Sequence, residues 1–472
     1  MVFNSFGFVG FWIVALIILT VINTTGKNIH LKNGILLLLS YIFYGSFNLS
    51  FLTILLYITA INYIAGLCMS NYQDREKIIV SIDIILSLIP LVAYKYAEFI
   101  LKDIFGIPQH DLGALGSLIM PIGISFYTFQ ALSYTIDLYR HKIPCERNPL
   151  TFALFVSFFP TVLSGPIEKA RDLLPQLNSE RKMSISAIGE GVLIFTWGLF
   201  KKIVIADRLS EYVDWVYGNS NYLTGSTIAL AAVFYSIQIY CDFSGYSDMA
   251  WGVAKSLGFD ITRNFNFPYI ATSIKDFWRR WHIALTSWFT EYVYFSLGGN
   301  RVKYKVQWMF NISMVFILSG VWHGAAWNFL LWGCLHAFYY LIEYFLGLQR
   351  KGFVMPKAWR PLAWLTVFIL ITIAWIFFRI PTFDEACYAV TKIFTDLFSP
   401  VKTGASTFTF AINSCLVMTF IAFDWILYRF ISNKKTGEIK TTFISGSLWF
   451  VSLLLAMAFF GASSDKFVYF QF

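Results

Sequence analysis

Two histidines stand in tryptophan-rich segments of the sequence. His282 ends the motif FWRRWH, and His323 lies between Trp322 and Gly324 in an otherwise apolar stretch. An ionisable side chain inside an apolar segment of membrane-spanning length is rare and marks a functional site by default. Imidazole titrates near neutral pH, so both histidines are candidates for acid or base chemistry. His336, thirteen residues beyond His323, is interpreted as a histidine of the core.

A second polar cluster lies in residues 235–250, YSIQIYCDFSGYSDMA. Gln238, Asp242 and Tyr246 recur every four residues, which predicts that they share one helical face. Carboxylates in an apolar helix are costly in lipid, so Asp242 and Asp248 are expected to face a protein-lined cavity or an ion path. The alternative is that these groups join helices by hydrogen bonds. We take Gln238, Asp242 and Tyr246 as candidate substrate-binding residues.

Residues 264–288, NFNFPYIATSIKDFWRRWHIALTSW, predict a short helix with a marked start. Ser273 followed three residues later by Asp276 is typical of a helix N-terminus. Tryptophans of the same segment suit a helix that lies at the membrane interface. They are Trp278, Trp281 and Trp288.

Fixed positive charge follows in the same region. Arg279 and Arg280 belong to FWRRWH, and Arg301 follows in YFSLGGNRVKYK. Guanidinium groups match phosphate oxygens, so these arginines are candidates to bind the phosphates of an anionic donor at a cytoplasmic mouth. Anchoring to lipid headgroups is the alternative for each of them.

The composition shows what kind of chain must position these residues. Of 472 residues, 57% are apolar and 13% are charged, against roughly 25% charged in soluble proteins, which excludes a water-soluble enzyme. The net charge of +9 comes from short basic clusters between apolar runs, a positive-inside pattern rather than a nucleic-acid surface. Six widely spaced cysteines predict neither a zinc site nor a disulfide framework. Aromatic residues, at 19%, exceed what a plain lipid-facing bundle needs.

Apolar stretches long enough to approach a membrane span recur along the chain. Several are short or interrupted by Gly and Pro, which is tolerated only where protein or a water-filled cavity surrounds the backbone. We predict an all-α membrane protein with about 11 spanning helices around shorter re-entrant and interfacial ones, in a single domain over residues 1–472. Placing the basic loops in the cytoplasm puts both termini outside. The stretches are 7–24, 34–46, 50–69, 78–96, 118–136, 150–164, 186–205, 226–240, 306–322, 326–347, 361–379, 408–431 and 444–462.

These motifs resemble a known family. RRWH and VWHGAAWNF resemble the paired signatures of the membrane-bound O-acyltransferase superfamily. Residues 120–140 and 240–250, with NFNFPY, LGGNR and the terminal FVYFQF, are more closely similar to its bacterial alginate O-acetylation branch. The resemblance runs from about residue 35 to the last residue.

The resemblance implies a ring of helices around a central funnel, in the bacterial cytoplasmic (inner) membrane. It gives His323 the position of the catalytic histidine and His282 that of the second signature histidine, and it adds Trp322 and Asn328 of VWHGAAWNF as substrate-binding candidates. The implied reaction moves acetyl from cytoplasmic acetyl-CoA to a hydroxyl, with no metal or prosthetic group. Burial would favour the neutral imidazole that accepts a proton. His282 would then orient the acceptor or donate to the thioester oxygen.

The C-terminal residues 467–472, FVYFQF, add a further expectation. They resemble the F-x-Y-F ending of a small partner peptide in teichoic-acid alanylation, whose tyrosine is thought to carry the acyl group. We predict an extracytoplasmic tail in which Tyr469 acts as a covalent acyl carrier. The alternative is an aromatic residue of the membrane interface.

The acceptor implied by the resemblance is an envelope or secreted polysaccharide, alginate-like or peptidoglycan. Relatives with these motifs usually work with a separate extracytoplasmic Ser-His-Asp (SGNH-type) partner, and this sequence has no such element of its own. Two other classes stay open at this point. A polytopic transporter would also explain buried carboxylates and histidines, although paired halves are absent from the sequence, and a scaffold for periplasmic polysaccharide-modifying enzymes is the other.

Overall fold

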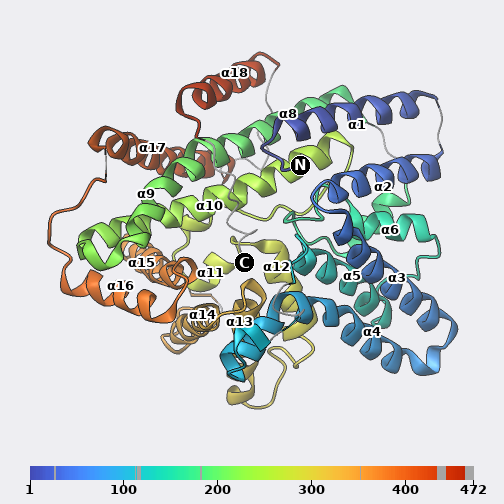
Figure 1. Cartoon of the computed structure of the whole chain (residues 1–472), viewed down its shortest axis with the longest axis horizontal. Coiled ribbons are helices and arrows are strands. Elements are labelled where there is room, and N and C mark those ends of the chain that lie inside the picture. The colour runs from blue at the N-terminus through green and yellow to red at the C-terminus, as the bar shows by residue number, and fades with distance from the viewer. Residues whose placement is uncertain are drawn as a thin grey trace. The chain divides into compact units, whose positions relative to one another are not determined.

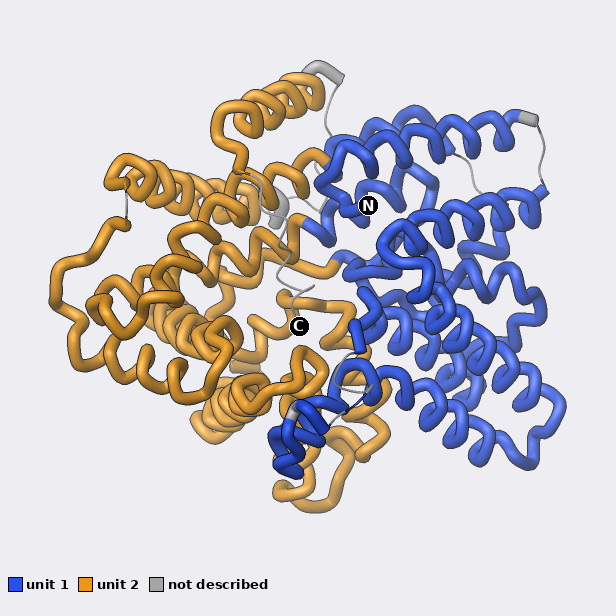
Figure 2. Tube along the Cα trace, in the orientation of Figure 1, with its two compact units in different colours: residues 1–195, 246–263 blue, residues 196–245, 264–472 orange. Residues whose placement is uncertain are grey.

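The protein is described by a computed structural model that covers residues 1–25, 28–111, 113, 118–180, 183–350, 352–353, 355–404, 406–432 and 443–462. Within these ranges all regular elements are helices and no strand occurs, which confirms the predicted all-α class (Figure 1). Contacts divide the chain into two compact units (Figure 2). Unit 1 comprises residues 1–195 and 246–263, and unit 2 comprises residues 196–245 and 264–472.

Helices of membrane-spanning length and composition occur in both units. Six are found among the described residues, so the predicted number of about 11 spans stays a prediction. The longest of them, α10 (Gly225–Ser256), is also the most enclosed by protein and continues from unit 2 into unit 1. The six are Phe6–Thr24, Leu49–Asn71, Gln73–Tyr96, Gly225–Ser256, Lys357–Arg379 and Thr407–Arg429.

Asparagines start several helices of unit 1. The side-chain oxygen of Asn28 accepts from the backbone N–H of His30 and Leu31, while Asn48 and Asn148 cap the helices α3 (Leu49–Asn71) and α6 (Pro149–Ser157) in the same way. Each satisfies backbone donors that the first helical turn leaves without a partner. The elements that lie in unit 1, or begin there, are α1 (Phe6–Thr25), α2 (Ile29–Gly45), α3 (Leu49–Asn71), η1 (Gln73–Arg75), α4 (Glu76–Leu91), η2 (Val92–Tyr96), η3 (Phe99–Ile104), η4 (Gln109–Asp111), α5 (Ile124–Tyr139), α6 (Pro149–Ser157), α7 (Ala170–Leu177) and α8 (Ile185–Phe200).

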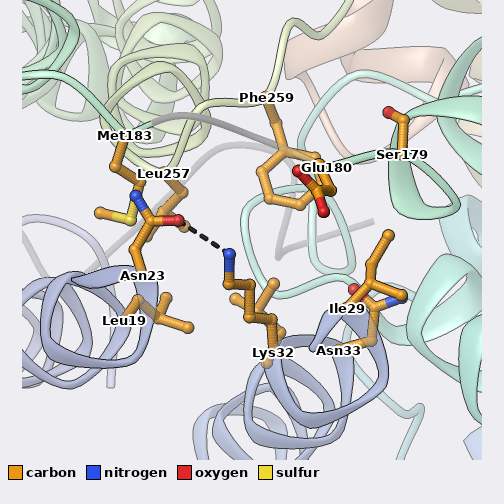
Figure 3. Close-up of a pocket in the computed structure, with 11 residues that line it drawn as sticks. Leu19, Asn23, Ile29, Lys32, Asn33, Ser179, Glu180, Met183, Leu257 and Phe259 are labelled. Atoms are coloured by element: carbon orange, nitrogen blue, oxygen red, sulfur yellow. Dashed lines mark hydrogen bonds between the residues drawn. The ribbon is translucent and has the colours of Figure 1, made fainter. Parts of the chain in front are cut away.

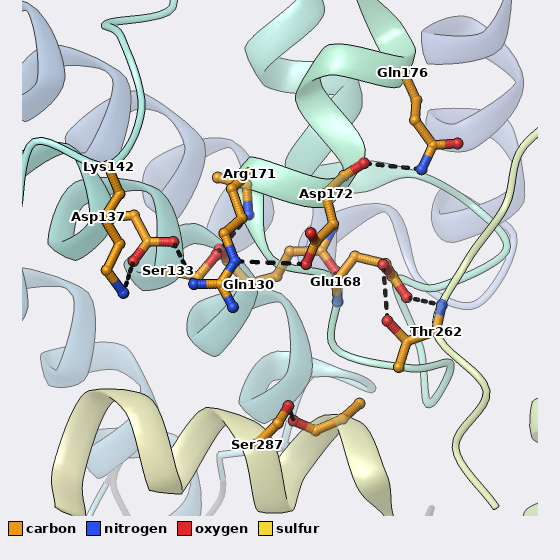
Figure 4. Close-up of polar contacts among 12 residues, drawn as sticks. Gln130, Ser133, Asp137, Lys142, Glu168, Arg171, Asp172, Gln176, Thr262 and Ser287 are labelled. Atoms are coloured by element: carbon orange, nitrogen blue, oxygen red, sulfur yellow. Dashed lines mark hydrogen bonds and ion pairs between the residues drawn. The ribbon is translucent and has the colours of Figure 1, made fainter. Parts of the chain in front are cut away.

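Buried polar contacts join distant segments of unit 1 (Figure 4). Glu168, in the loop before α7, accepts hydrogen bonds from the backbone N–H of Thr262 at 2.7 Å and from its hydroxyl at 3.3 Å. The backbone N–H of Glu168 donates to Gln130 of α5. The side chain of Gln176 forms two hydrogen bonds with the main chain of Asp260. The segment that leaves α10 is therefore fixed to α7 and its preceding loop by side chains.

Unit 2 contains the segments that carry the two signature histidines. Its elements are η6 (Lys201–Ala206), α9 (Asp207–Gly218), η7 (Ser220–Tyr222), the first part of α10, η8 (Pro268–Ile270), α11 (Ile274–Trp278), α12 (Ile283–Phe289), η9 (Thr290–Tyr294), α13 (Lys305–His323), α14 (Trp327–Phe345), η10 (Lys357–Trp359), α15 (Arg360–Arg379), α16 (Phe383–Thr395), α17 (Thr407–Ser432) and α18 (Phe443–Phe460).

Helices α13 and α14 form a tight hairpin in unit 2. A methyl group added to Gly320 would collide with the backbone oxygen of Phe329, and one added to Gly333 with that of Phe316. The two helices therefore approach closely enough to need glycine at both contacts. His323 is the last residue of α13, and the extended backbone of Gly324 ends the helix there. Gly320 and Gly333 thus serve the contact between the two helices.

The tryptophans predicted to lie at the membrane interface are instead buried in unit 2, so that prediction was wrong. Trp278, Trp281 and Trp288 are all at least 93% buried, and Trp281 is enclosed almost completely. The Trp281 ring stacks on Phe277 at 5.5 Å and contacts Trp375 at 4.9 Å. The short helices α11 and α12 are thus covered by other elements of the unit. Part of the aromatic excess is core packing.

We predict a pH-dependent stability difference at Glu168. Burial raises the pKa of the Glu168 carboxyl to about 8, and the nearby Asp172 and Asp260 carboxylates add to the rise against the opposing hydrogen bonds from Thr262. The stability gained from the raised pKa is full below the ordinary pKa of an exposed glutamate and is lost as pH rises through about 8. Glu168→Gln mimics the protonated group, so it should match the wild type at pH 5 and unfold at a temperature several degrees higher at pH 9.

The matched control is Glu190→Gln, because Glu190 is half exposed and its carboxylate lies 3.8 Å from Lys255. Thermal unfolding between pH 5 and 9 measures both variants. If the unfolding temperatures of the wild type and Glu168→Gln differ by the same amount at every pH in this range, the raised pKa of Glu168 is contradicted.

Candidate functional site

His282 lies in the turn between α11 and α12 on a backbone that few residues adopt. Its φ is 44°, in the left-handed region, which costs a non-glycine residue free energy unless the surroundings enforce it. Hydrogen bonds on both sides do so, because Asn266 N–H donates to the Arg280 carbonyl and Ile283 N–H donates to the Asn264 carbonyl, both at 2.9 Å. The NFNFPY segment thus holds the turn and orients the imidazole.

Asn264 also fixes which nitrogen of His282 carries the proton. Its side-chain oxygen accepts from the backbone N–H of Ala284 at 3.1 Å and contacts His282 Nδ1 at 3.0 Å. A backbone N–H is always a donor, so this contact identifies the oxygen of the Asn264 amide. His282 must then donate from Nδ1, which makes Nε2 the nitrogen with the lone pair.

Burial keeps His282 neutral. The side chain is 1% exposed, and it lies outside the six candidate spans. Removal from water lowers the pKa of the imidazole to about 3, because the charged form loses its solvation. In this tautomer a neutral His282 acts as a hydrogen-bond acceptor at Nε2. Of the two roles predicted for it, orientation of an acceptor hydroxyl fits this geometry, whereas donation to a thioester oxygen does not.

His323 lies close to His282 within unit 2. The two ring centroids are 6.5 Å apart, and Trp322 contacts both rings, at 5.0 Å from His323 and 5.9 Å from His282. His323 is 3% exposed and packs edge-on against Trp332 and Phe378. Residues that are 41 positions apart in the sequence are thereby brought into one aromatic enclosure. We call His282, His323 and these surrounding rings the histidine pair and its aromatic enclosure.

The enclosure also includes Phe243 of α10, whose ring centroid lies 4.7 Å from that of His282. Behind His323, Trp332 contacts His336 at 4.6 Å. His336 accepts a hydrogen bond at Nδ1 from Trp278 Nε1 at 3.3 Å and is fully buried. This confirms its interpretation as a histidine of the core.

Asp242 belongs to a buried group of three charges in unit 2. The Lys202 ammonium lies 2.6 Å from Asp242 and 2.7 Å from Asp207, and all three side chains are almost completely buried. Lys202 belongs to the π-helix η6, an arrangement often found near functional sites. Gln238 lies one turn before Asp242 in α10, as predicted, and is also buried. A substrate-binding role for either residue stays a prediction, since the Asp242 charge is matched within the protein.

The predicted phosphate-binding arginines differ from one another in exposure. Arg280 forms an ion pair with Asp276 at 2.8 Å and donates to the Asn266 carbonyl at 3.2 Å, so it stabilises the turn that carries His282. Arg279 and Arg301 are exposed. Ser273 caps the start of α11, because its hydroxyl accepts from the backbone N–H of Asp276 at 3.0 Å, which confirms the predicted N-terminus.

Two further candidates make structural contacts. The Asn328 side-chain amide donates to the carbonyls of Ile380 and Pro381, which fixes the turn between α15 and α16. Tyr246 belongs to unit 1, where its ring stacks on Phe3 at 4.7 Å. Their predicted contacts with substrate stay predictions. Tyr469 and the tail 467–472 lie outside the described residues.

Sequence reasoning missed several residues that form the site. Asn264 and Phe243 contact His282, Phe378 contacts His323, and Lys202 binds Asp242. The sequence could have indicated Asn264, because NFNFPY is a compact motif of uncharged polar and aromatic residues. It could also have indicated Lys202, which belongs to a pair of lysines inside an apolar run. Neither pattern predicts which residue Asn264 or Lys202 contacts. Among the described residues no cluster of His, Cys, Asp or Glu is arranged to hold a metal ion.

Comparisons with known proteins cover the whole of this site. The family model for the membrane-bound O-acyltransferase family matches residues 146–382, a segment that contains both histidines. A probable alginate O-acetylase of Azotobacter vinelandii is 36% identical over 87% of this chain and 82% of its own length. A peptidoglycan O-acetyltransferase of Helicobacter pylori is 34% identical, with 81% of this chain and 76% of the relative covered. A teichoic acid D-alanyltransferase of Bacillus subtilis is 30% identical over 54% of this chain and 65% of its own length.

We predict that the charge group around Lys202 contributes to stability through pairing. Lys202→Met leaves two buried carboxylates without their cation and should destabilise the protein by about 3–5 kcal/mol. The triple variant Lys202→Met/Asp207→Asn/Asp242→Asn removes the charges together and should recover most of the loss. Thermal unfolding of the detergent-solubilised protein measures both.

The control for this prediction is Lys255→Met. The side chain of Lys255 is partly exposed, and its ammonium lies 3.8 Å from the Glu190 carboxylate. Its effect should stay below about 1 kcal/mol. Equal effects of Lys202→Met and Lys255→Met would show that the buried group does not depend on charge pairing.

Proposed function

Because the chain belongs to the membrane-bound O-acyltransferase family, we propose that it moves acetyl from cytoplasmic acetyl-CoA to an envelope or secreted polysaccharide. It is a multi-pass membrane acyltransferase, and its relatives are named for O-acetylation of alginate and of peptidoglycan. The finer parts of the proposal are the donor, the roles of the residues and the use of an extracytoplasmic partner. No observation favours a transporter or a scaffold.

The observation that carries the proposal is the histidine pair in its aromatic enclosure. Two buried imidazoles lie 6.5 Å apart between centroids, and one of them is fixed as an acceptor at Nε2. Acyl transfer to a hydroxyl needs a base for the hydroxyl proton and exclusion of water, which would otherwise hydrolyse the acyl donor. Tryptophan and phenylalanine rings around both histidines supply that exclusion.

In the proposed reaction His323 is the general base and His282 orients the nucleophile. The acceptor hydroxyl has one proton, which it first donates in a hydrogen bond to His282 Nε2 and then turns towards His323 as its oxygen approaches the thioester carbonyl. His323 takes the proton, the C–O bond forms, the C–S bond breaks, and the proton then passes to the leaving CoA thiolate. The neutral imidazole of His323 holds the proton between its loss from the hydroxyl and its transfer to the thiolate.

The exposed Arg279 and Arg301 are proposed to contact the phosphates of the donor. Arg280 fits a different role, because its guanidinium pairs with Asp276 and donates to the Asn266 carbonyl beside the His282 turn. We assign Arg280 to holding the His282 turn.

The acceptor in the first transfer is proposed to be the phenol of Tyr469. The phenol oxygen attacks the thioester, an acetyl ester forms on tyrosine and CoA leaves as the thiol. Attack by a hydroxyl group of the SGNH-type partner, or of the polysaccharide, then moves the acetyl on and regenerates the phenol. This sequence of steps fits the proposed topology, with both termini on the extracytoplasmic face of the inner membrane.

The test of this function is acetyl transfer by the purified full-length protein. With radiolabelled acetyl-CoA, His323→Ala should lose at least about 10³-fold in transfer rate, as expected for removal of a general base, while a cooperative unfolding transition shows that the chain is still folded. The control is His110→Ala, because His110 is exposed and pairs only with its neighbour Asp111 at 3.5 Å among the described residues. Transfer at the wild-type rate in His323→Ala would overturn the proposal.

Mapping the label in the same experiment tests the carrier. Label should appear on Tyr469 in the wild type and disappear in Tyr469→Phe. Label on a histidine, or unchanged acetyl transfer by Tyr469→Phe, would reject Tyr469 as the carrier and leave the assignment of His323 standing.

Asn264 is predicted to be a positioning residue for His282. Asn264→Ala removes the acceptor for His282 Nδ1 and should lower the transfer rate by about 10²-fold through misorientation. Asn264→Asp keeps the acceptor oxygens and adds a negative charge, which favours the imidazolium form. It should therefore recover part of the rate and move the acidic limb of the pH profile to higher pH. Equal losses in both variants with identical pH profiles would indicate a merely structural role.

A further inference from the structure

An open pocket lies in unit 1 (Figure 3). Its empty volume, with the open solvent at its mouth included, is about 480 Å³. Leu36, Leu257 and Phe259, which line its apolar part, are at least 96% buried. Lys32 and Glu180 line the same pocket with opposite charges. The pocket therefore offers an apolar floor and a charged rim.

The pocket lies where the first apolar helix of unit 1 ends and the second begins. The candidate span Phe6–Thr24 contributes Leu19 and Asn23 near its end, and the following apolar helix Ile29–Gly45 contributes Lys32 from its first turn. A chain that leaves the membrane after the first helix and returns with the second makes this turn at headgroup depth. The ligands most abundant at that depth are phospholipids.

The two charges are arranged to meet a ligand that carries both signs. Lys32 Nζ donates to the Asn23 side-chain oxygen at 2.8 Å (Figure 3), and an ammonium group has three donors, so donors remain for an anion. Within the described part of the chain, neither Lys32 nor Glu180 forms an ion pair. A phosphate would satisfy the lysine, while the glutamate would accept hydrogen bonds from a cation.

We propose that this pocket binds one phospholipid with a phosphate and a primary ammonium in its headgroup, as in phosphatidylethanolamine. The phosphate contacts Lys32, the ammonium contacts Glu180, and the glycerol and upper acyl carbons cover Leu36 and Phe259. A choline headgroup has no N–H to donate to Glu180 and prefers a cage of aromatic rings, whereas Phe259 is the one aromatic side chain lining the described pocket. A glycerol headgroup leaves the glutamate without a cation.

The experiment is native mass spectrometry of the full-length protein in detergent, titrated with phosphatidylethanolamine, phosphatidylcholine or phosphatidylglycerol. We expect one phosphatidylethanolamine bound at least about 10-fold more tightly than either other lipid. Lys32→Ala should weaken its binding about 10-fold, because one charge-assisted contact is lost. Glu180→Gln should remove the preference over phosphatidylglycerol.

The matched control is Lys77→Ala, because Lys77 is an exposed lysine at the start of α4 in the same unit. It should bind the lipid as the wild type does. Leu36→Trp fills the floor without a change of charge and should exclude all three lipids, with the unfolding temperature as the check that the chain is folded.

Four results would overturn the proposal. Equal affinities for the three lipids would remove the headgroup argument, and equal effects of Lys32→Ala and Lys77→Ala would remove the site. Displacement of the lipid by glycerophosphoethanolamine at equal concentration would identify a soluble headgroup ligand. Displacement by CoA would assign the pocket to the acyl donor.

Discussion

Removing an imidazole from water costs free energy unless its nitrogens are hydrogen-bonded, and unit 2 is built around that constraint at His282. The 3.0 Å contact with Asn264 satisfies Nδ1, and the Asn264 main chain also pairs with Ile283. One residue thus fixes the left-handed turn, the orientation of the ring and its tautomer. Aromatic rings can then close around the imidazole, because the polar group that they cover on the Nδ1 side is already satisfied.

The same constraint explains why the charges of unit 2 lie where they do. A lysine in an apolar helix is tolerable only with anionic partners, and Lys202 has two, from α9 and α10. The π-helical turn at η6 presents both Lys201 and Lys202 to the interior, where Lys201 donates to Ser244 at 2.8 Å. The change of helix type at η6 thus coincides with the burial of two adjacent cations.

Sequence patterns predicted the class of fold, the start of α11, the shared face of Gln238 and Asp242, and the core role of His336. Those properties depend on local spacing and on the polarity of single residues. The burial of Trp278 and Trp288 was not predictable in that way, because the residues next to a tryptophan in the sequence do not distinguish a core position from an interfacial one. The partners of Asp242 and His282 were not predictable either, since they come from segments 40 and 18 residues away.

The identity of residue 264 bears on which histidine of the proposed mechanism holds the proton. Two imidazoles 6.5 Å apart in a dry enclosure cannot both be cationic, because each charge opposes the other and neither is solvated. A carboxylate beside His282 Nδ1 would stabilise the cation there, as in hydrolase triads, whereas the neutral amide of Asn264 does so only weakly. The buried carboxylate of α10, Asp242, is neutralised by Lys202. We infer that the proton from the acceptor hydroxyl goes to His323, and that asparagine at position 264 is what makes the two histidines unequal.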